Sequence, residues 1–331
     1  MFRGKQNFVF VADKAPRETY RLALSKKQKD TAMPGSTKTL RRDLTFTMPF
    51  SNVLHLSFAD KIEATQRAGF SELTLQPQEV RRIVGQGLSI GDMKAIAADG
   101  GVRINRLDPL CTWNPNWQPK NMDDAFVADH SMPAEEFFAL CNAFGCQYMS
   151  LNATFAHDRY SQQQQVDFYA GICQRAAEHG LVCDLEPIPM WGVRSLENGW
   201  DIVRQAGQAN GGLVLDTLHF TRSHSSLETL AGIPGDRIHC VQICDGVLAL
   251  PEGTTLEQDC FQRLWPGQGD FVLKPIISLL NDIGGLNQVG PEVFSLANAA
   301  LSAEAVAAAC RHSLQHFDEL CEVPSKVRAT F

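Results

Sequence analysis

Short apolar segments alternate with amphipathic segments along most of the chain. Buried parallel strands read as continuous apolar runs. Such runs predict strands at residues 43–48, 71–77, 102–110, 147–154, 181–186, 211–216, 238–245 and 286–295. Between them, apolar residues recur at helical spacing and often stop at a glycine. This second pattern predicts helices at residues 57–70, 89–101, 133–146, 163–180, 195–207, 225–232, 271–285 and 302–320.

The alternation is clearest between residues 181 and 220. Two apolar runs, LVCDLE and GGLVLD, flank the segment SLENGWDIVRQAG, where Ser195 can act as the helix N-cap. A strand, a helix and a strand with such short connections form a βαβ unit with parallel neighbours. Repeated eight times over about 290 residues, the unit predicts a single (β/α)₈ TIM barrel at residues 43–331. An open doubly wound sheet is the alternative, but no GxGxxG motif follows an early strand.

Four of the predicted strands carry an oxygen-bearing side chain near their C-terminal ends, where α/β barrels place catalytic groups. They are Glu186, Asp216, Gln242 and Glu292. A buried carboxylate must be paired, protonated or bound to a metal, because an isolated buried charge is too costly. An all-oxygen set favours a hard divalent ion, Mg²⁺ or Mn²⁺, with Co²⁺ as a further option. Taken singly, each carboxylate could instead cap a helix or form a salt bridge.

Composition favours a soluble globular protein, with 44% hydrophobic and 20% charged residues among 331. No apolar run approaches the roughly 18 residues that a transmembrane helix needs, and we find no signal peptide. The ten cysteines include no CxxC pair, which disfavours a thiolate zinc site and fits a reduced cytoplasm. Cys141, Cys173, Cys183 and Cys240 lie in apolar runs and are expected in the core.

Charge is distributed unevenly along the chain. Residues 1–42 contain eleven Lys and Arg and three Asp and Glu, whereas the remainder contains 19 basic and 34 acidic residues. We expect residues 1–42 to form a poorly ordered basic extension, or to be translated upstream sequence if Met33 or Met48 is the true start. An acidic body argues against a nucleic-acid partner. We therefore expect a small-molecule substrate and no nucleic-acid or membrane partner; homo-oligomerisation stays open.

The order of short motifs adds a resemblance to a known family. LEPIP, LDTLHF, IHCVQICD, RLWPGQGDF and GPEVFS follow one another as in the xylose isomerase-like barrels. This superfamily of sugar-phosphate isomerases and epimerases also includes endonuclease IV, and the resemblance covers residues 43 to about 320. It implies Glu, Asp, His and Glu as the four strand-end metal ligands. Gln242 stands where the His is common, and in this it resembles the bacterial 3-dehydroshikimate dehydratase branch. The histidines and basic groove of endonuclease IV-like members are missing.

The resemblance also implies roles for side chains next to these ligands. His219 follows Asp216 as in the family's DxxH motif and would contact substrate oxygens or relay a proton; a helix cap is the alternative. Arg263, in the glycine-rich RLWPGQGDF segment, could bind a substrate carboxylate or phosphate. An ion pair with Asp270 or Glu292 is its plain alternative.

Aromatic and amide side chains after the predicted strands are further candidates for substrate contact. Trp191, in the loop after Glu186, could wall the pocket or cover the barrel rim, as could Trp113 and Trp117. Asn152, at the end of a predicted strand, is a weaker candidate for substrate contact.

Together these residues predict chemistry next to a carbonyl. A chelated cation would act as a Lewis acid, with Glu186 and Glu292 as acid and base on either side of the substrate. The predicted activity is that of a metal-dependent isomerase or epimerase acting on a polyhydroxylated carbonyl compound. A lyase of the 3-dehydroshikimate or inosose dehydratase type is the alternative, because of Gln242 and Arg263. A non-catalytic sugar-binding barrel or subunit is the alternative from another class.

Overall fold

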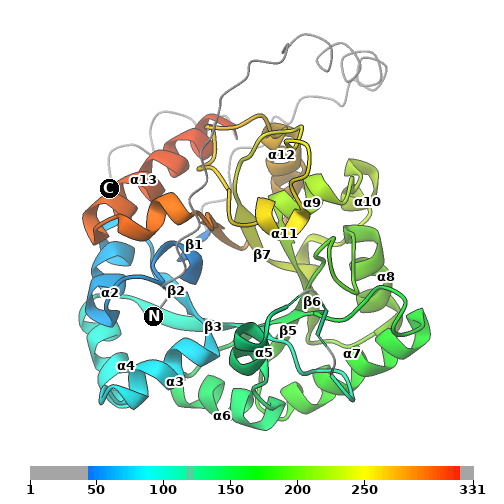
Figure 1. The fold of residues 1–331 in the computed structure, drawn as a ribbon, viewed down its shortest axis with the longest axis horizontal. Coiled ribbons are helices and arrows are strands. Elements are labelled where there is room, and N and C mark those ends of the chain that lie inside the picture. Colours follow the sequence, from blue (N-terminus) through cyan, green and yellow to red (C-terminus); the bar gives the residue numbers. More distant parts are fainter. Residues whose placement is uncertain (1–43, 118, 121, 321–331) are drawn as a thin grey trace. The chain divides into compact units, whose positions relative to one another are not determined.

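The computed structural model describes residues 44–117, 119–120 and 122–320, with side chains described up to residue 313. Its strands form one closed barrel in which each pairs in parallel with the next and β8 pairs with β1 (Figure 1). The predicted TIM barrel is therefore confirmed; the expectation for residues 1–42 lies outside the described residues. The strands are β1 (Thr45–Met48), β2 (Glu72–Leu75), β3 (Arg103–Leu110), β4 (Tyr148–Asn152), β5 (Val182–Glu186), β6 (Gly211–Asp216), β7 (Ile238–Ile243) and β8 (Gln288–Pro291).

Helices surround the barrel as an outer ring (Figure 1). Every predicted helix is present: α2 (Phe58–Arg67), α4 (Ile90–Asp99), α6 (Ala134–Phe144), α7 (Gln162–Ala177), α8 (Leu196–Ala206), α10 (Leu227–Ala231), α12 (Leu273–Ile283) and α13 (Ala303–Leu320). Further helices lie outside the predicted set: α3 (Pro77–Gly85), α5 (Asp124–His130), α9 (Thr217–Arg222) and α11 (Leu256–Asp259). None of the helices in the described part of the chain is long and apolar enough to cross a bilayer.

The β5–α8–β6 unit forms as the sequence predicts. The Ser195 side chain accepts a hydrogen bond from the Asn198 backbone N–H at the start of α8. Gly207 ends the helix in the left-handed conformation that glycine adopts without strain. Because β5 and β6 pair in parallel, Glu186 and Asp216 emerge at the same end of the barrel.

The space between strands and helices is filled by apolar side chains. Phe137 and Phe138 of α6 and Tyr169 of α7 are fully buried there, and the Tyr169 hydroxyl donates to the Cys183 carbonyl oxygen. The four cysteines expected in the core, Cys141, Cys173, Cys183 and Cys240, are all buried and free. This layer packs the helices against the strands.

A buried polar network lies inside the barrel, nearer the N-terminal ends of the strands than the residues at their C-terminal ends. Arg106 of β3 donates to Asp184 Oδ2 at 2.7 Å and to Gln288 Oε1 at 3.0 Å, so its contacts cross from β3 to β5 and β8. Arg106 and Asp184 are almost completely inaccessible to solvent. On its other oxygen, Asp184 contacts His239 Nδ1 at 2.6 Å. Gly212 makes room for this contact, because a Cβ there would lie 2.3 Å from His239 Nδ1.

The His239–Asp184 pair should make stability depend on pH. Burial disfavours the imidazolium, but the Asp184 carboxylate outweighs it and raises the pKa of His239 above its ordinary value. The pair therefore contributes its full stabilisation below about pH 6.5, the ordinary histidine value. That contribution is lost as pH rises through the raised pKa of the folded protein. We expect the free energy of unfolding, measured with urea, to fall over this range in the native protein and to fall less in a His239→Gln variant.

The matched control is His312→Gln, at an exposed position of α13. It should leave the pH profile of the native protein unchanged. Equal slopes for the native protein and for His239→Gln would contradict the assignment.

Candidate active site at the C-terminal end of the barrel

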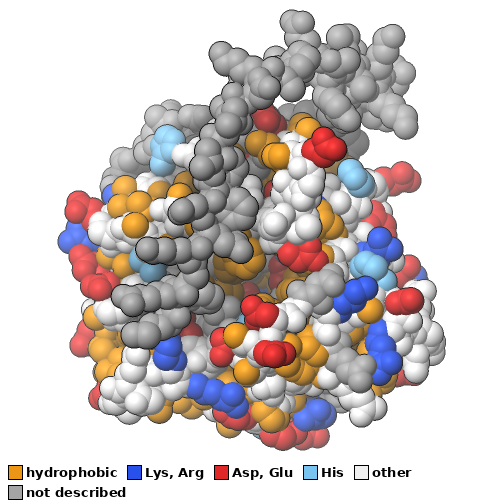
Figure 2. Space-filling view, in the orientation of Figure 1, with side chains coloured by type: hydrophobic (Ala, Val, Ile, Leu, Met, Phe, Trp, Pro, Cys, Tyr) orange, Lys and Arg blue, Asp and Glu red, His pale blue; other side chains and the backbone are white. Residues whose placement is uncertain are grey.

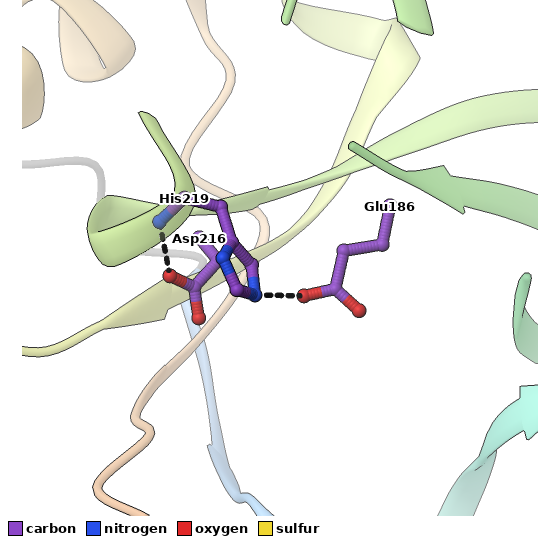
Figure 3. Close-up of side chains that lie close together, drawn as sticks. All are labelled: Glu186, Asp216 and His219. Carbon is purple, nitrogen blue, oxygen red and sulfur yellow. Dashed lines mark hydrogen bonds and ion pairs between the residues drawn. The ribbon is translucent and has the colours of Figure 1, made fainter. Parts of the chain in front are cut away.

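Three acidic or imidazole side chains converge beyond β5 and β6. One ligand atom from each of Glu186, Asp216 and His219 lies within 4.8 Å of the other two, and all three residues are buried. His219 Nε2 lies 3.6 Å from Glu186 Oε1, and the side chains point toward one another (Figure 3). Two of the three predicted strand-end carboxylates and the predicted histidine thus belong to one cluster.

Asp216 positions this histidine through the backbone. Its Oδ1 accepts hydrogen bonds from the backbone N–H groups of Leu218 (2.7 Å) and His219 (3.0 Å), which makes it the N-cap of α9. A helix therefore starts immediately after β6, and His219 falls in its first turn. Asp216 rather than His219 is the cap, so the alternative interpretation of His219 as a helix cap is not needed.

Arg263 joins the cluster from the long segment between β7 and β8. Its Nη1 lies 2.5 Å from Asp216 Oδ2 and 2.9 Å from Glu292 Oε2. Arg263 is 3% exposed, and its guanidinium carbon lies 5.2 Å from the centre of the Phe294 ring. Of the two ion pairs considered from the sequence, the one with Glu292 forms, and Asp216 completes a bridge between two strand ends.

The segment that carries Arg263 is tied down on both sides of it. Leu264 exchanges two backbone hydrogen bonds with Asp245, both 2.9 Å, just after β7. The Arg263 backbone N–H donates to the Phe294 carbonyl oxygen at 3.1 Å, just after β8. The Asp245 carboxylate also accepts from the backbone N–H of Gly267 at 3.0 Å. These hydrogen bonds hold Arg263 at the barrel mouth, although the residues around it form no regular secondary structure.

Gln242 of β7 is held by two carboxylates. Its Nε2 donates to Glu292 Oε1 at 2.9 Å and to Asp108 Oδ2 at 3.4 Å. Its Oε1 is buried and has no hydrogen-bond partner among the described residues. Because the amide nitrogen is committed to acceptors, the orphaned oxygen is the atom that this side chain can offer to a cation or a donor.

Asp108, near the end of β3, is a site residue that the sequence interpretation missed. It is 3% exposed, and burial raises its pKa to about 6. The signal was present in RLDPL, where a carboxylate stands near the end of a predicted strand, as Glu186, Asp216 and Glu292 do. Because it faces Gln242, Asp108 connects the site with the polar network below.

The two glutamates of the site are suited to hold a proton. Burial, followed by the nearby carboxylates with Asp108 foremost, raises the pKa of Glu186 well above its ordinary value. Burial also raises the pKa of Glu292 well above the ordinary value, even though Arg263 opposes the shift. Carboxyl groups in such surroundings can act as acid and base near neutral pH. A bound cation would stabilise their ionised forms.

Asp216 behaves differently from Glu292, although both contact Arg263. Burial opposes its ionisation, but Arg263, His219 and the backbone N–H of His219 together lower the pKa of Asp216 below its ordinary value. The ionised partner of the guanidinium is therefore Asp216. Burial lowers the pKa of His219 to about 4, so its imidazole is neutral at pH 7 and available as a donor, an acceptor or a metal ligand.

The donor set fits a divalent cation. It combines carboxylate oxygens, the unpartnered Gln242 Oε1 and the His219 imidazole, which are groups that bind divalent ions in proteins. The imidazole adds a nitrogen donor that the predicted all-oxygen set did not include, and this widens the range of suitable ions to zinc. The predicted ligands Gln242 and Glu292 contact each other, whereas Glu186, Asp216 and His219 form the tighter group.

Comparison with known proteins identifies the family. The sequence profile of the family described as xylose isomerase-like TIM barrel matches residues 62–318. The chain belongs to this family. The resemblance seen in the sequence motifs is therefore confirmed, and the relatives that the chain matches are enzymes of the sugar isomerase and epimerase type and dehydratases.

Two curated relatives cover different shares of the chain. A 3-dehydroshikimate dehydratase from Pseudomonas aeruginosa is 27% identical over 263 residues, which make up 78% of this chain and 40% of that protein. An inosose isomerase from Bacillus licheniformis is 37% identical over 184 residues, which make up 53% of this chain and 65% of that protein. The match thus spans less than two thirds of either relative.

Solved structures share the family fold. The crystal structure of the IOLI protein with a bound zinc atom has a TM-score of 0.72, is 21% identical, and the match covers 84% of this chain and 99% of that one. D-allulose 3-epimerase from Methylomonas sp. in complex with D-allulose has a TM-score of 0.61, is 16% identical, and the match covers 86% and 99%. At this level of identity the likeness concerns the fold.

The remaining predicted contact residues lie at or just after the ends of β3, β4 and β5. Asn152, with its amide nitrogen turned toward Glu186, donates to Glu186 Oε2 at 3.1 Å; this orientation is assigned from the hydrogen-bond partners. Trp191 is half-buried and its ring lies 6.5 Å from that of Phe126 in α5. Trp113 donates to the Asn152 carbonyl oxygen at 2.9 Å. Figure 2 shows acidic and apolar side chains around a hollow on this face.

Proposed function

We propose that this chain is a divalent-metal-dependent isomerase or epimerase that removes a proton next to the carbonyl of a polyhydroxylated substrate. The observation that carries the proposal is the buried convergence of Glu186, Asp216 and His219 at the mouth of a xylose isomerase-like barrel. Relatives named for inosose and allulose support this class of substrate. We place the activity in the cytoplasm, on a small molecule and without a nucleic-acid or membrane partner.

Four strand-end side chains would hold the cation: Glu186, Asp216, Gln242 and Glu292. When bound, the ion supplies Lewis acidity that favours negative charge on the substrate oxygens. Mg²⁺ and Mn²⁺ remain the first candidates and Co²⁺ the next. Zn²⁺ must be tested beside them, because His219 offers nitrogen to the same cluster.

Glu186 and Glu292 would carry the proton. They approach from β5 and from the residue after β8, and both have raised pKa values, so one can accept a proton while the other donates one. Asn152 contacts one oxygen of Glu186, and His219 lies 3.6 Å from the other, which fixes the carboxyl plane. A neutral His219 could contact a substrate hydroxyl or pass a proton to Glu186.

The substrate would be held by groups around the mouth. Arg263 is the candidate for binding a carboxylate or phosphate group of the substrate. Trp191, near Phe126 of α5, would form an apolar wall, and Asn152 would contact a substrate oxygen. We propose these roles from the position of each side chain at the barrel mouth and from its chemical type.

A dehydratase is the second candidate. Loss of a β-hydroxyl from the same deprotonated carbonyl compound gives an unsaturated product, so the two reactions share their first step. Gln242 at the third ligand position and the similarity to 3-dehydroshikimate dehydratase over 78% of this chain favour this alternative. A non-catalytic sugar-binding barrel is the candidate from another class.

Proton NMR in D₂O distinguishes these candidates. The chain, stripped with a chelator and reloaded with Mg²⁺, would be mixed with ketoses, their phosphates, an inosose and 3-dehydroshikimate. Deuterium entering an α-position together with a new sugar would support the isomerase or epimerase. Loss of water would identify a lyase. Metal binding without exchange of any substrate proton, also with other divalent ions, would favour the binding barrel.

The ligand set also predicts a change of metal preference. Replacing Gln242 by His substitutes a nitrogen donor for the amide oxygen and should shift affinity toward Zn²⁺ relative to Mg²⁺. Competition titrations with a zinc indicator would measure the ratio of the two dissociation constants. A ratio unchanged from the native protein would remove Gln242 from the ligand set.

A further inference from the structure

The most unusual feature of the site is that a guanidinium already holds two of the proposed ligands. Arg263 Nη1 contacts Asp216 Oδ2 at 2.5 Å and Glu292 Oε2 at 2.9 Å. The other oxygens of these carboxylates are engaged as well: Asp216 Oδ1 by the start of α9 and Glu292 Oε1 by Gln242. A cation bound by Asp216 and Glu292 and the Arg263 side chain therefore need the same oxygen atoms.

The bridge does not have the geometry of a permanent structural ion pair. The strongest arginine–carboxylate pairs use two parallel N–H···O bonds from two nitrogens. Here Nη1 makes both ion-pair contacts and also approaches the Glu292 carbonyl oxygen at 3.3 Å. Over the residues that the structure describes, Nε of Arg263 is buried and has no partner. A buried donor without a partner is costly, so the guanidinium is less than fully satisfied where it lies.

The Arg222–Asp259 pair beneath the same β7–β8 segment shows the contrast. Arg222 Nε and Nη2 contact the two oxygens of Asp259 at 2.6 and 3.2 Å; Nη2 also donates to the Val247 carbonyl oxygen, and Nη1 donates to that of Leu248. This arginine has the forked geometry of a structural anchor. The chain thus uses one arginine to fix the segment and presents the other, less fully bonded, to the site.

We propose that Arg263 is a built-in competitor of the divalent cation, which must displace the guanidinium from Asp216 and Glu292 in order to bind them. The inference rests on the proposed function, since it assumes that these carboxylates are ligands. This competition lowers the apparent metal affinity in proportion to the fraction of molecules in which the two carboxylates are free of Arg263. Such competition is also compatible with the proposed anion-binding role of Arg263. Once the cation is bound to Asp216 and Glu292, the guanidinium is free to bind a carboxylate or phosphate of the substrate.

The test is metal affinity in an Arg263→Gln variant, without any activity assay. Chelator-treated native and variant proteins are titrated with Mn²⁺ and Co²⁺ by calorimetry, and their Tm values are measured without metal. We expect Arg263→Gln to bind Mn²⁺ about tenfold tighter or more. Its Tm without metal should be lower than that of the native protein, because the buried Asp216 carboxylate loses its counter-ion.

Arg222→Gln is the matched control: it removes the same charge from an arginine of α9 that pairs with Asp259 in the β7–β8 segment and with no proposed ligand. It should lower the Tm without tightening metal binding. If Arg263→Gln binds Mn²⁺ as weakly as the native protein, or more weakly, the inference is overturned while metal dependence stays intact. The same holds if Arg263→Gln and Arg222→Gln both bind Mn²⁺ more tightly by the same factor. Binding by Arg263→Gln alone, with none by the native protein, supports it. Binding by neither protein overturns it together with the metal-dependent function.

Discussion

Glu186→Gln should reduce proton exchange on the substrate by about 10²–10⁴-fold, the usual contribution of a general acid or base. Glutamine keeps the shape of the side chain and can still meet Asn152 and His219, but it cannot accept the substrate proton. Deuterium incorporation from D₂O, followed by NMR with the substrate identified from the panel, measures the loss. Calorimetric titration of the same variant with Mn²⁺ shows whether the loss of exchange reflects lost proton transfer or lost metal binding.

Glu178→Gln provides the control for this substitution. It makes the same chemical change at an exposed residue that caps α7 and should leave exchange unchanged. If Glu186→Gln exchanges substrate protons at the native rate with metal bound, another group is the base. Glu292 is then next to be tested, because its pKa is also raised well above the ordinary value.

Arg106→Met should cost about 3–5 kcal/mol of the free energy of unfolding, the range expected when one partner of a buried ion pair is removed. The substitution leaves the Asp184 carboxylate in the barrel interior without its strongest partner and removes donors from Gln288 and Ser150. Urea unfolding followed by circular dichroism measures the change.

Two further variants show whether the buried charge is the cause. Arg204→Met removes a surface arginine paired with Asp201 and should cost no more than about 1 kcal/mol. Adding Asp184→Asn to Arg106→Met should recover part of the loss, since the unpaired charge is then gone. If Arg106→Met costs as little as the surface change, the polar network does not stabilise the fold.

The barrel could be predicted from the sequence because its signals are local and repeated. Buried parallel strands are apolar throughout, and helix ends are marked by residues such as Ser195 and Gly207 that act within one turn. Two of the helices outside the prediction follow a strand almost without a loop: α3 begins at Pro77, two residues after the last residue of β2, and α9 begins directly after Asp216, where the carboxylate ends a strand and caps a helix at once. The other two, α5 and α11, have N-caps at Asp123 and Thr255 but are short, with seven and four residues.

The site was only partly predictable, for a physical reason. That Glu186 and Asp216 end neighbouring strands follows from chain order. The position of the Arg263 guanidinium depends on the path of an irregular segment set by bonds to Asp245 and Phe294, which no local pattern encodes. Asp108 was missed because its strand continues for two more residues beyond it.

The proposed cation ligands all come from one side of the barrel, from β5, β6, β7 and the residue after β8. The strands β1 to β4 contribute none of the four. Their loops instead carry bulky aromatic groups, such as Trp113 and Trp117, which are tethered to the end of β4 through the Asn152 carbonyl oxygen and the Thr154 hydroxyl. On the proposed function the cation ligands therefore belong to the second half of the barrel, whereas substrate contacts would come from both halves, with Trp113 and Trp117 in the first and Trp191 and Arg263 in the second. Exchanging the loops of the first half between relatives would then change part of the proposed substrate pocket and leave all four proposed cation ligands in place.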